Sequence, residues 1–113
     1  MQLRLTIEGD PMLAWELFDH PKTMEAGVTT VAAPGGVTVR YEGEFEVKAF
    51  DVPAVLKVVV QIGREVAVGL FATWLYDKLK GGRARRLRVD RLQVEITEGE
   101  IKRVLLERIE EEE

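Results

Sequence analysis

Alternating apolar and polar residues open the chain. In residues 2–8 leucine or isoleucine alternates with polar residues, which predicts a half-buried strand. Asp10 and Pro11 then fit the N-cap and the first position of a helix, because aspartate can accept hydrogen bonds from free backbone N–H groups and proline has none to lose. We therefore expect a short helix that ends before Pro21.

The longest alternation lies farther along the chain. Residues 27–33 are compatible with a strand, and residues 34–36 (Pro-Gly-Gly) form a turn signal that favours a hairpin. From residue 37 to residue 49, every odd-numbered residue is apolar or glycine and every even-numbered residue is polar. We expect one strand over 37–49, bent or bulged at Gly43, with its polar side in water. The alternative is two strands joined by a turn at Glu42-Gly43.

A helical period begins after Asp51, a good N-cap residue. Apolar residues recur at helical spacing, and glycines 81–82 supply a stop. We therefore predict one helix over residues 52–80. Its second part, residues 66–76, carries no charge, and a helix that is apolar all round is buried on every side. This part is expected to meet the C-terminal helix, a second copy of the chain or a partner.

A strand pair and a helix complete the pattern. Residues 85–89 and 92–96 alternate with opposite parity, as a hairpin with a two-residue turn requires. Thr97 and Glu100 have the spacing of a capping box, so the last helix should begin there. Glu110–Glu113 lie at the negative end of its dipole and are expected to fray.

The predicted order of elements, β-α-β-β-α-β-β-α, indicates the fold class. Its first six elements match the split βαββαβ of the ferredoxin-like plan, in which helices cover one face of an antiparallel sheet. We expect a single α+β domain over residues 1–113, with an extra strand and a C-terminal helix, whose sheet is covered by one long helix. An open α+β sheet with another strand order is the alternative.

Composition excludes several chemistries. The chain has 113 residues, enough for one core, and contains neither cysteine nor serine. Disulfides, thiolate metal sites and cysteine or serine nucleophiles are therefore excluded, and we expect a cytoplasmic protein. His20 is the single histidine and lacks metal-ligand spacing. We expect no catalytic residues, cofactor or metal. Charges interrupt every longer apolar window, so a membrane span is not expected.

Charge is unevenly distributed. The net charge is −4, which argues against a general nucleic-acid binder. Residues 83–91 nevertheless form a basic segment that could bind an anionic partner or pair with carboxylates of the chain. Its cations are Arg83, Arg85, Arg86, Arg88 and Arg91. The polar side of residues 37–49 is acidic and is either a solvated face or a docking face for a basic partner. Its carboxylates are Glu42, Glu44 and Glu46.

The C-terminal half has a distinctive order of features: an apolar helix that ends in Trp-Leu and basic residues, a short strand pair, and a helix opened by threonine and glutamate. The residues that carry this order are Trp74, Leu75, Lys78, Lys80, Thr97 and Glu100. This half resembles the effector-associated constant component type of small bacterial protein. The resemblance implies a non-enzymatic adaptor that connects a sensor to an effector in bacterial conflict systems. No functional residues carry over.

The sequence leaves three hypotheses about function. The first, which we expect, is a small bacterial interaction or adaptor domain that binds a protein partner or self-associates through its long apolar helix. The predicted contact residues are Val68, Phe71, Ala72, Trp74 and Leu75. The second is a nucleic-acid-associated protein that uses residues 83–91 and whose binding weakens steeply with salt. The third is an enzyme whose acidic pocket forms only on folding.

Overall fold

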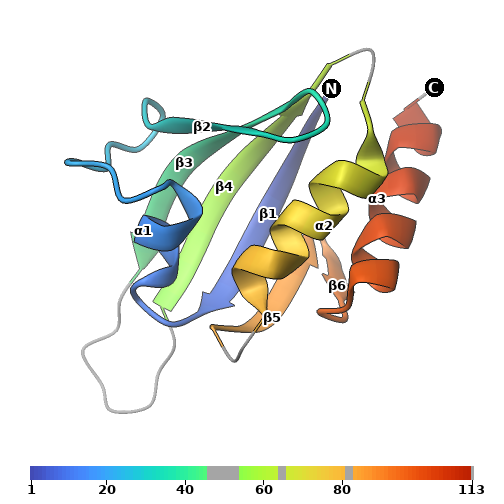
Figure 1. The fold of residues 1–113 in the computed structure, drawn as a ribbon. Helices are drawn as coiled ribbons and strands as arrows, with labels where there is room; N and C mark the ends of the chain where they lie inside the picture. The colour runs from blue at the N-terminus through green and yellow to red at the C-terminus, as the bar shows by residue number, and fades with distance from the viewer. Residues whose placement is uncertain (46–53, 64–65, 81–82, 113) are drawn as a thin grey trace.

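The computed structural model describes residues 1–45, 54–63, 66–80 and 83–112. These residues form one antiparallel sheet in the order β2-β3-β4-β1-β5-β6, with three helices on one side (Figure 1). The strands are β1 (Gln2–Gly9), β2 (Thr30–Ala33), β3 (Val37–Phe45), β4 (Ala54–Ile62), β5 (Ala84–Val89) and β6 (Leu92–Val94). The helices are α1 (Leu13–Leu17), α2 (Val68–Leu79) and α3 (Glu98–Glu112). The predicted α+β class is confirmed.

Strand β4 takes the place of the first half of the predicted long helix, so the prediction of one helix over residues 52–80 is wrong. The strand lies between β3 and β1 and pairs with both. Its even-numbered residues are buried, whereas Lys57 and Gln61 between them are exposed. Apolar residues are so dense here that they satisfy helical spacing and alternation equally. The valines favour the strand because β-branched side chains pack well on a pleated surface, and two neighbouring strands satisfy the backbone on both edges.

The additional strand changes the predicted order of elements. The described residues follow the order β-α-β-β-β-α-β-β-α. Helix α2 has only 12 residues, and it shares its side of the sheet with α1 and α3 (Figure 1), so the prediction of one long covering helix is also wrong. The six-strand order differs from the four-stranded ferredoxin-like plan. The predicted cap at Asp51 and the predicted stop at residues 81–82 lie outside the described residues.

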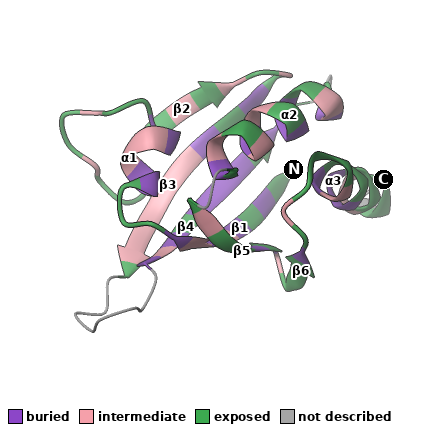
Figure 2. Cartoon of the chain, turned by 60° about the horizontal axis from the view of Figure 1, so that its bottom comes forward, coloured by how far each residue is buried: buried purple, intermediate pink, exposed green. Residues whose placement is uncertain are grey.

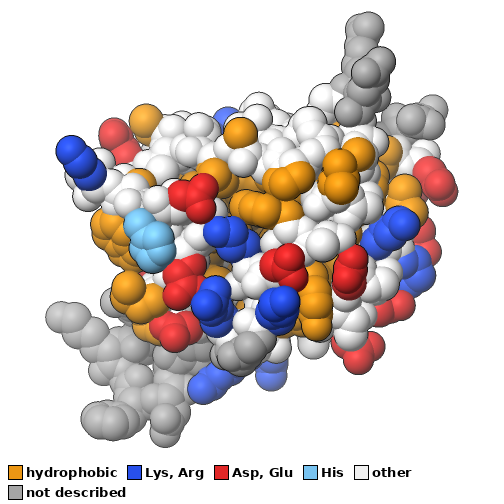
Figure 3. Space-filling view, viewed as in Figure 1, with side chains coloured by type: hydrophobic (Ala, Val, Ile, Leu, Met, Phe, Trp, Pro, Cys, Tyr) orange, Lys and Arg blue, Asp and Glu red, His pale blue; other side chains and the backbone are white. Residues whose placement is uncertain are grey.

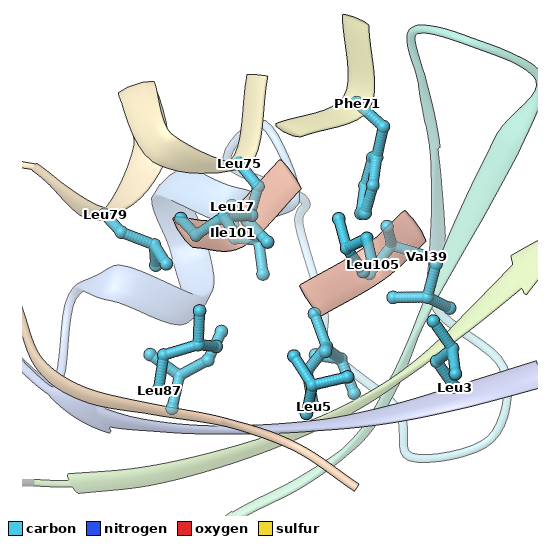
Figure 4. Packing of buried hydrophobic residues seen from close by; sticks show 14 of the residues in the cluster. Leu3, Leu5, Leu17, Val39, Phe71, Leu75, Leu79, Leu87, Ile101 and Leu105 are labelled. Carbon is cyan, nitrogen blue, oxygen red and sulfur yellow. The ribbon is translucent and has the colours of Figure 1, made fainter. Parts of the chain in front are cut away.

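The core fills the space between the sheet and the helices (Figure 4). Phe71 and Leu75 of α2 reach towards Leu5 of β1, and α3 contributes Ile101 and Leu105 from the side. Each of these five side chains is at most 1 % exposed. No polar or charged side chain is buried among the described residues. One face of α2 is therefore part of the ordinary core of this chain. The expectation that residues 66–76 are buried on every side is wrong, because Leu70 is 60 % exposed.

The first helix begins later than predicted: α1 starts at Leu13 with Met12 as its N-cap, so the prediction of Asp10 as N-cap and Pro11 as first helical residue is wrong. Asp10 instead closes the turn that precedes the helix. The Asp10 carboxylate accepts a hydrogen bond of 2.8 Å from the backbone N–H of Met12, and the Asp10 carbonyl accepts one from Leu13. Satisfying these N–H groups lets the chain turn directly from β1 into α1. The helix buries Leu13, Ala14 and Leu17 against the core.

The hairpin β5–β6 and helix α3 also form where predicted, although β6 ends at Val94 and not at residue 96. Arg88 pairs with Gln93 in the expected register. The Thr97 hydroxyl accepts a hydrogen bond of 3.2 Å from the Glu100 N–H, which is half of the capping box. The Glu100 carboxylate instead binds Arg103 at 2.8 Å, and this bond lowers the pKa of Glu100. Helix α3 continues to Glu112, past most of the residues predicted to fray.

A β-bulge at Gly43 reverses the two sides of β3, and the prediction of a bend or bulge at this residue is confirmed. Tyr41 and Gly43 pair with consecutive residues of β4, so Glu42 is an extra residue in the strand. Gly43 has a φ of 134°, a value that residues with a Cβ atom rarely adopt. Because of the extra residue, the predicted unbroken parity is wrong at Phe45, which lies on the side of Lys57. Residues 46–49 of the predicted strand lie outside the described residues.

Burial alternates along the central strands (Figure 2). In β1 it alternates strictly from Gln2 to Ile7, with odd-numbered residues buried, and the buried side is the side on which the helices lie. No helix of the described ranges covers the other side of the sheet (Figure 1). None of the helices in those ranges is long and apolar enough to cross a membrane.

Candidate binding surface on the open sheet face

The side of the sheet that faces away from the helices is here called the open face. Its side chains alternate with the buried ones, and strand pairing places them in rows. It consists of Gln2, Arg4, Thr6 and Glu8 of β1, Thr38, Arg40 and Phe45 of β3, Val55, Lys57, Val59 and Gln61 of β4, and Arg86 and Arg88 of β5. Five of these residues are cationic, whereas Glu8 and the bulge residue Glu42, which lines the same face, are acidic, so this face differs in sign from the whole chain.

Three cations surround Thr6 at the centre of the open face. Thr6 pairs with Lys57 of β4 on one side and with Arg88 of β5 on the other. Strands lie about 4.8 Å apart, so Lys57 and Arg88 are separated by about 10 Å at the backbone. Arg4 projects from the same face two residues before Thr6. All three cations are exposed.

These three cations differ from their neighbours in ion pairing. Arg40 forms an ion pair with Glu42, and Arg86 has a longer one of 3.7 Å with Glu8. Within the described ranges no carboxylate lies within 4 Å of the side-chain nitrogens of Arg4, Lys57 or Arg88. The centre of the open face therefore carries positive charge that this part of the chain does not neutralise.

Asp90 lies at the rim of this face and is already engaged. Its carboxylate accepts hydrogen bonds of 2.6 and 3.1 Å from the Arg108 guanidinium of α3 and one of 3.1 Å from the Arg4 backbone N–H. Asp90 has a φ of 53° in the β5–β6 turn, which aspartate tolerates better than most residues. These contacts join α3 to the edge of the sheet and leave Asp90 little capacity to neutralise the Arg4 side chain.

A shallow pocket of ≈ 400 Å³ is hollowed into the open face. Arg4, Thr6, Arg40 and Lys57 are among the residues that line it. Val59, which is 8 % exposed, pairs with both Arg4 and Arg40 and gives the pocket an apolar floor. The pocket combines cationic walls with an apolar base, which suits a ligand that is both anionic and partly flat.

Phe45 adds an aromatic ring to the open face. It is 60 % exposed, and the Nζ atom of Lys57 lies 5.1 Å from the ring centroid, a cation–π distance. The bulge at Gly43 is the reason that the ring lies on this side, because without the extra residue Phe45 would share the side of Tyr41. The predicted basic segment contains no aromatic residue, and the fold supplies one from another strand.

The structure separates the five arginines of the predicted basic segment. Arg86 and Arg88 lie on the open face. Arg83 forms an ion pair of 2.8 Å with Glu16 of α1, so it faces the helices. Arg85 is exposed at a register shift of β5, and Arg91 is exposed in the β5–β6 turn. Only part of the predicted anionic-partner site is therefore brought together.

The predicted acidic face does not form as one surface. Glu42 lines the pocket of the open face and pairs with Arg40. Glu44 pairs with the core residue Leu56, so it projects to the opposite side, where its charge raises the pKa of Tyr41 together with burial of that phenol. Glu46 lies outside the described residues. The bulge separates Glu42 from Glu44, and a continuous acidic stripe over these two residues is therefore wrong.

The predicted contact residues of the apolar helix are mostly core. Val68, Phe71, Ala72 and Leu75 are at most 8 % exposed. Trp74 is partly exposed; its ring stacks on Phe71 at 5.8 Å. These side chains pack within the chain and present little surface to a partner.

Four residues of the open face escaped sequence reasoning. In the predicted pattern Arg4 and Arg40 are only members of the polar sides of residues 2–8 and 37–49. Lys57 was placed on a helix, and Phe45 was placed on the apolar side of β3. A signal for Lys57 was present, because Lys57 and Gln61 both occupy odd positions among buried even ones.

Groups suited to catalysis are scarce in the described ranges. His20 is exposed in the loop after α1. No group of three His, Asp or Glu side chains in those ranges is placed to hold a metal ion. The two carboxylates that line the pocket, Glu42 and Asp90, are held by Arg40 and Arg108.

Comparisons with protein-family models, with curated proteins and with solved structures found no match for this chain.

Proposed function

We propose that this chain is a non-enzymatic interaction domain that binds an anionic partner on the open face. The observation that carries the proposal is the set of three exposed cations, Arg4, Lys57 and Arg88, without a carboxylate partner in the described ranges. Like charges placed about 10 Å apart or less repel one another weakly in water, so this arrangement costs some stability. An anionic partner removes that repulsion and gains charge-assisted hydrogen bonds.

The proposed contact surface is therefore the open face of the sheet and not the apolar helix predicted from the sequence. Helix α2 uses its apolar residues in the core, whereas the open face has exposed charge, a pocket and an exposed ring. An adaptor role, as the resemblance to effector-associated constant components implies, is compatible with a binding domain of this kind. We propose it as the wider context of the binding function.

We also propose a ferredoxin-like core for the fold. The inner strands follow the order β3-β4-β1-β5, and α1 and α2 are the helices that precede β3 and β5 along the chain. Without β2, β6 and α3, this is a split βαββαβ arrangement. Its sheet would be covered on one side and free for binding on the other.

Charge reversal on the open face tests the binding function. We would measure retention of the purified chain on an immobilised polyanion, such as heparin, with Lys57→Glu and Arg88→Glu variants. Both variants should elute at clearly lower salt, and each cation lost should reduce the slope of log K against log salt by about one. Lys102→Glu on α3 is the matched control, because it makes the same charge change on the helix side and should elute like the unmodified chain.

The result that contradicts the proposal is equally specific. Equal weakening by Lys57→Glu and Lys102→Glu would mean that only net charge matters. Retention that does not change in Lys57→Glu and Arg88→Glu would mean that the open face takes no part. Circular dichroism of each variant confirms that the fold is intact.

A further inference from the structure

We infer that the anionic partner of the open face is a single-stranded nucleic acid, with a base stacked on Phe45 and the phosphates running over Lys57, Thr6 and Arg88. This inference rests on the proposed binding function and names the class of its ligand. Carboxylates of an acidic protein would satisfy the cations equally well. The choice between these two ligands depends on the aromatic ring and on the shape of the face.

The ring is the first argument. Single-stranded nucleic acids are bound by cationic surfaces that carry exposed aromatic side chains, because every base has a π-face that can stack. Phe45 is 60 % exposed, and it lies next to the central cations, with Lys57 Nζ 5.1 Å from its centroid. An acidic peptide has no group that requires a ring at this position. A base stacked on Phe45 keeps its own phosphate close to Lys57.

The row of residues across the strands is the second argument. Lys57, Thr6 and Arg88 occupy adjacent strands in direct register, so they form a line that crosses the sheet. The ends of this line are about 10 Å apart, which about three stacked nucleotides span at about 3.4 Å each. Two cations and a hydroxyl along one line suit a chain of phosphates, since all three can donate hydrogen bonds to phosphate oxygens.

The shape of the sheet excludes insertion into a duplex. Six strands at a spacing of about 4.8 Å make a surface about 24 Å wide, whereas the major groove of B-form DNA is about 12 Å wide and admits one helix or a two-stranded ribbon. A broad shallow face can instead bind bases that are already unstacked. The pocket of ≈ 400 Å³ beside the line offers room for the flat part of a nucleotide.

The rest of the molecule explains why the net charge of −4 does not oppose this inference. Helix α3 carries a concentration of acids, among them Glu98, Glu100, Glu107 and Glu111, and it lies on the helix side of the sheet (Figure 1). Local charge decides binding because salt screens charges beyond about 8–10 Å. The acidic helix side repels the phosphate backbone, and the basic open face attracts it.

Fluorescence anisotropy with a labelled single-stranded oligonucleotide of about 12 nucleotides tests the inference, at low salt and then across a salt series. Both RNA and DNA oligonucleotides of mixed sequence would be used as probes. Phe45→Ala should weaken binding by roughly 5- to 100-fold, the range of base–aromatic stacking, and Phe45→Trp should restore it. Leu70→Ala is the matched control, because Leu70 is also 60 % exposed but lies on α2; it should bind like the unmodified chain.

Competition identifies the ligand class. An unlabelled single strand should displace the probe, and a duplex of the same length or a poly-glutamate peptide should do so poorly. The inference is overturned if Phe45→Ala binds as tightly as the unmodified chain, or if poly-glutamate competes as well as the single strand. If Lys57→Glu and Arg88→Glu still lose retention on heparin in either case, the binding function stands and only the ligand class is wrong. If they retain it, the binding function fails as well.

Discussion

The helix side of the sheet and the centre of the open face differ in how their charges are paired. On the helix side, cations and carboxylates are interspersed around apolar side chains (Figure 3), and Arg83 pairs with Glu16 while Lys78 binds the Glu16 carbonyl at 2.9 Å. On the open face, Arg4, Lys57 and Arg88 have no such partner in the described ranges. Paired charges join neighbouring elements of this fold, whereas the three central cations of the open face have no carboxylate partner in the described ranges, and Lys57 instead contacts the Phe45 ring.

The largest expected effect is on the free energy of unfolding, and it should differ sharply between two phenylalanines. Phe71 is 1 % exposed in the core, whereas Phe45 is 60 % exposed on the open face. Phe71→Ala should lower the free energy of unfolding by about 3–5 kcal/mol, because it creates a cavity, whereas Phe45→Ala should change it by about 0.5 kcal/mol or less. Urea unfolding of both variants measures the difference. A Phe71→Ala variant that stays fully stable but loses self-association would return α2 to the role of an interface.

Gly43 decides on which side Phe45 lies, and its substitution should have the next largest effect. No atom lies within 4 Å of a Cβ built at Gly43, so the cost of Gly43→Ala comes from its φ of 134° and should be about 1–3 kcal/mol. Strand β3 can relieve that strain by losing the bulge, which would turn Phe45 away from Lys57. We therefore expect Gly43→Ala to weaken single-strand binding as well as stability. Gly99→Ala, on the exposed start of α3 and also without close atoms, should weaken neither.

Substitution of Asp90 should change stability and binding in opposite directions. Its bonds with Arg108 are charge-assisted and partly buried, so Asp90→Asn should lower the free energy of unfolding by about 1 kcal/mol. Asparagine tolerates the positive φ of this position, which makes it the least disruptive replacement. Because the substitution removes a negative charge from the rim of the open face, retention on heparin should rise slightly. A loss of retention in a folded Asp90→Asn variant would show that the polyanion binds elsewhere.

The smallest expected effect is on the pH dependence of stability, and it concerns Tyr41, the last core-facing residue before the bulge. Burial and then the Glu44 charge raise the pKa of its phenol above the ordinary value. A raised pKa in the folded state means that the stabilising contribution is complete below the pKa of the unfolded chain, about 10, and is lost as pH rises through the folded-state pKa. The melting temperature should therefore fall more between pH 9 and pH 11 for the native chain than for Tyr41→Phe. Equal falls would show that the pKa of the Tyr41 phenol is not raised in the folded chain.

Sequence reasoning located the elements with strong local signals. Asp10 binds the backbone in the turn before α1, and Thr97 does so at the start of α3. These signals are local, because a cap acts on N–H groups two or three residues away. The hairpin β5–β6 was also found, since its parity change is a local property of the turn. The α+β class followed from these elements.

The candidate surface was much less accessible to sequence reasoning. Arg88 was identified because it lies in a basic segment, but Arg4 and Lys57 are distant from it along the chain and meet it only through strand pairing. The position of Phe45 could be inferred only from the bulge. The sequence suggested a bulge at Gly43, but it did not show that the bulge moves Phe45 to the open face. A surface built from four strands cannot be inferred from the sequence of any one of them.

The sequence by itself determined the features that short-range rules govern: the alternation of β1, the Asp10 turn before α1, the Thr97 cap of α3, and the turn between β5 and β6. The tertiary structure alone decided the state of residues 54–62, because their valines fit a helix or a strand and the choice depends on hydrogen bonds offered by β1 and β3. It also decided which cations meet on the open face. Both decisions depend on residues far apart in the chain, whose contacts form only when the sheet assembles.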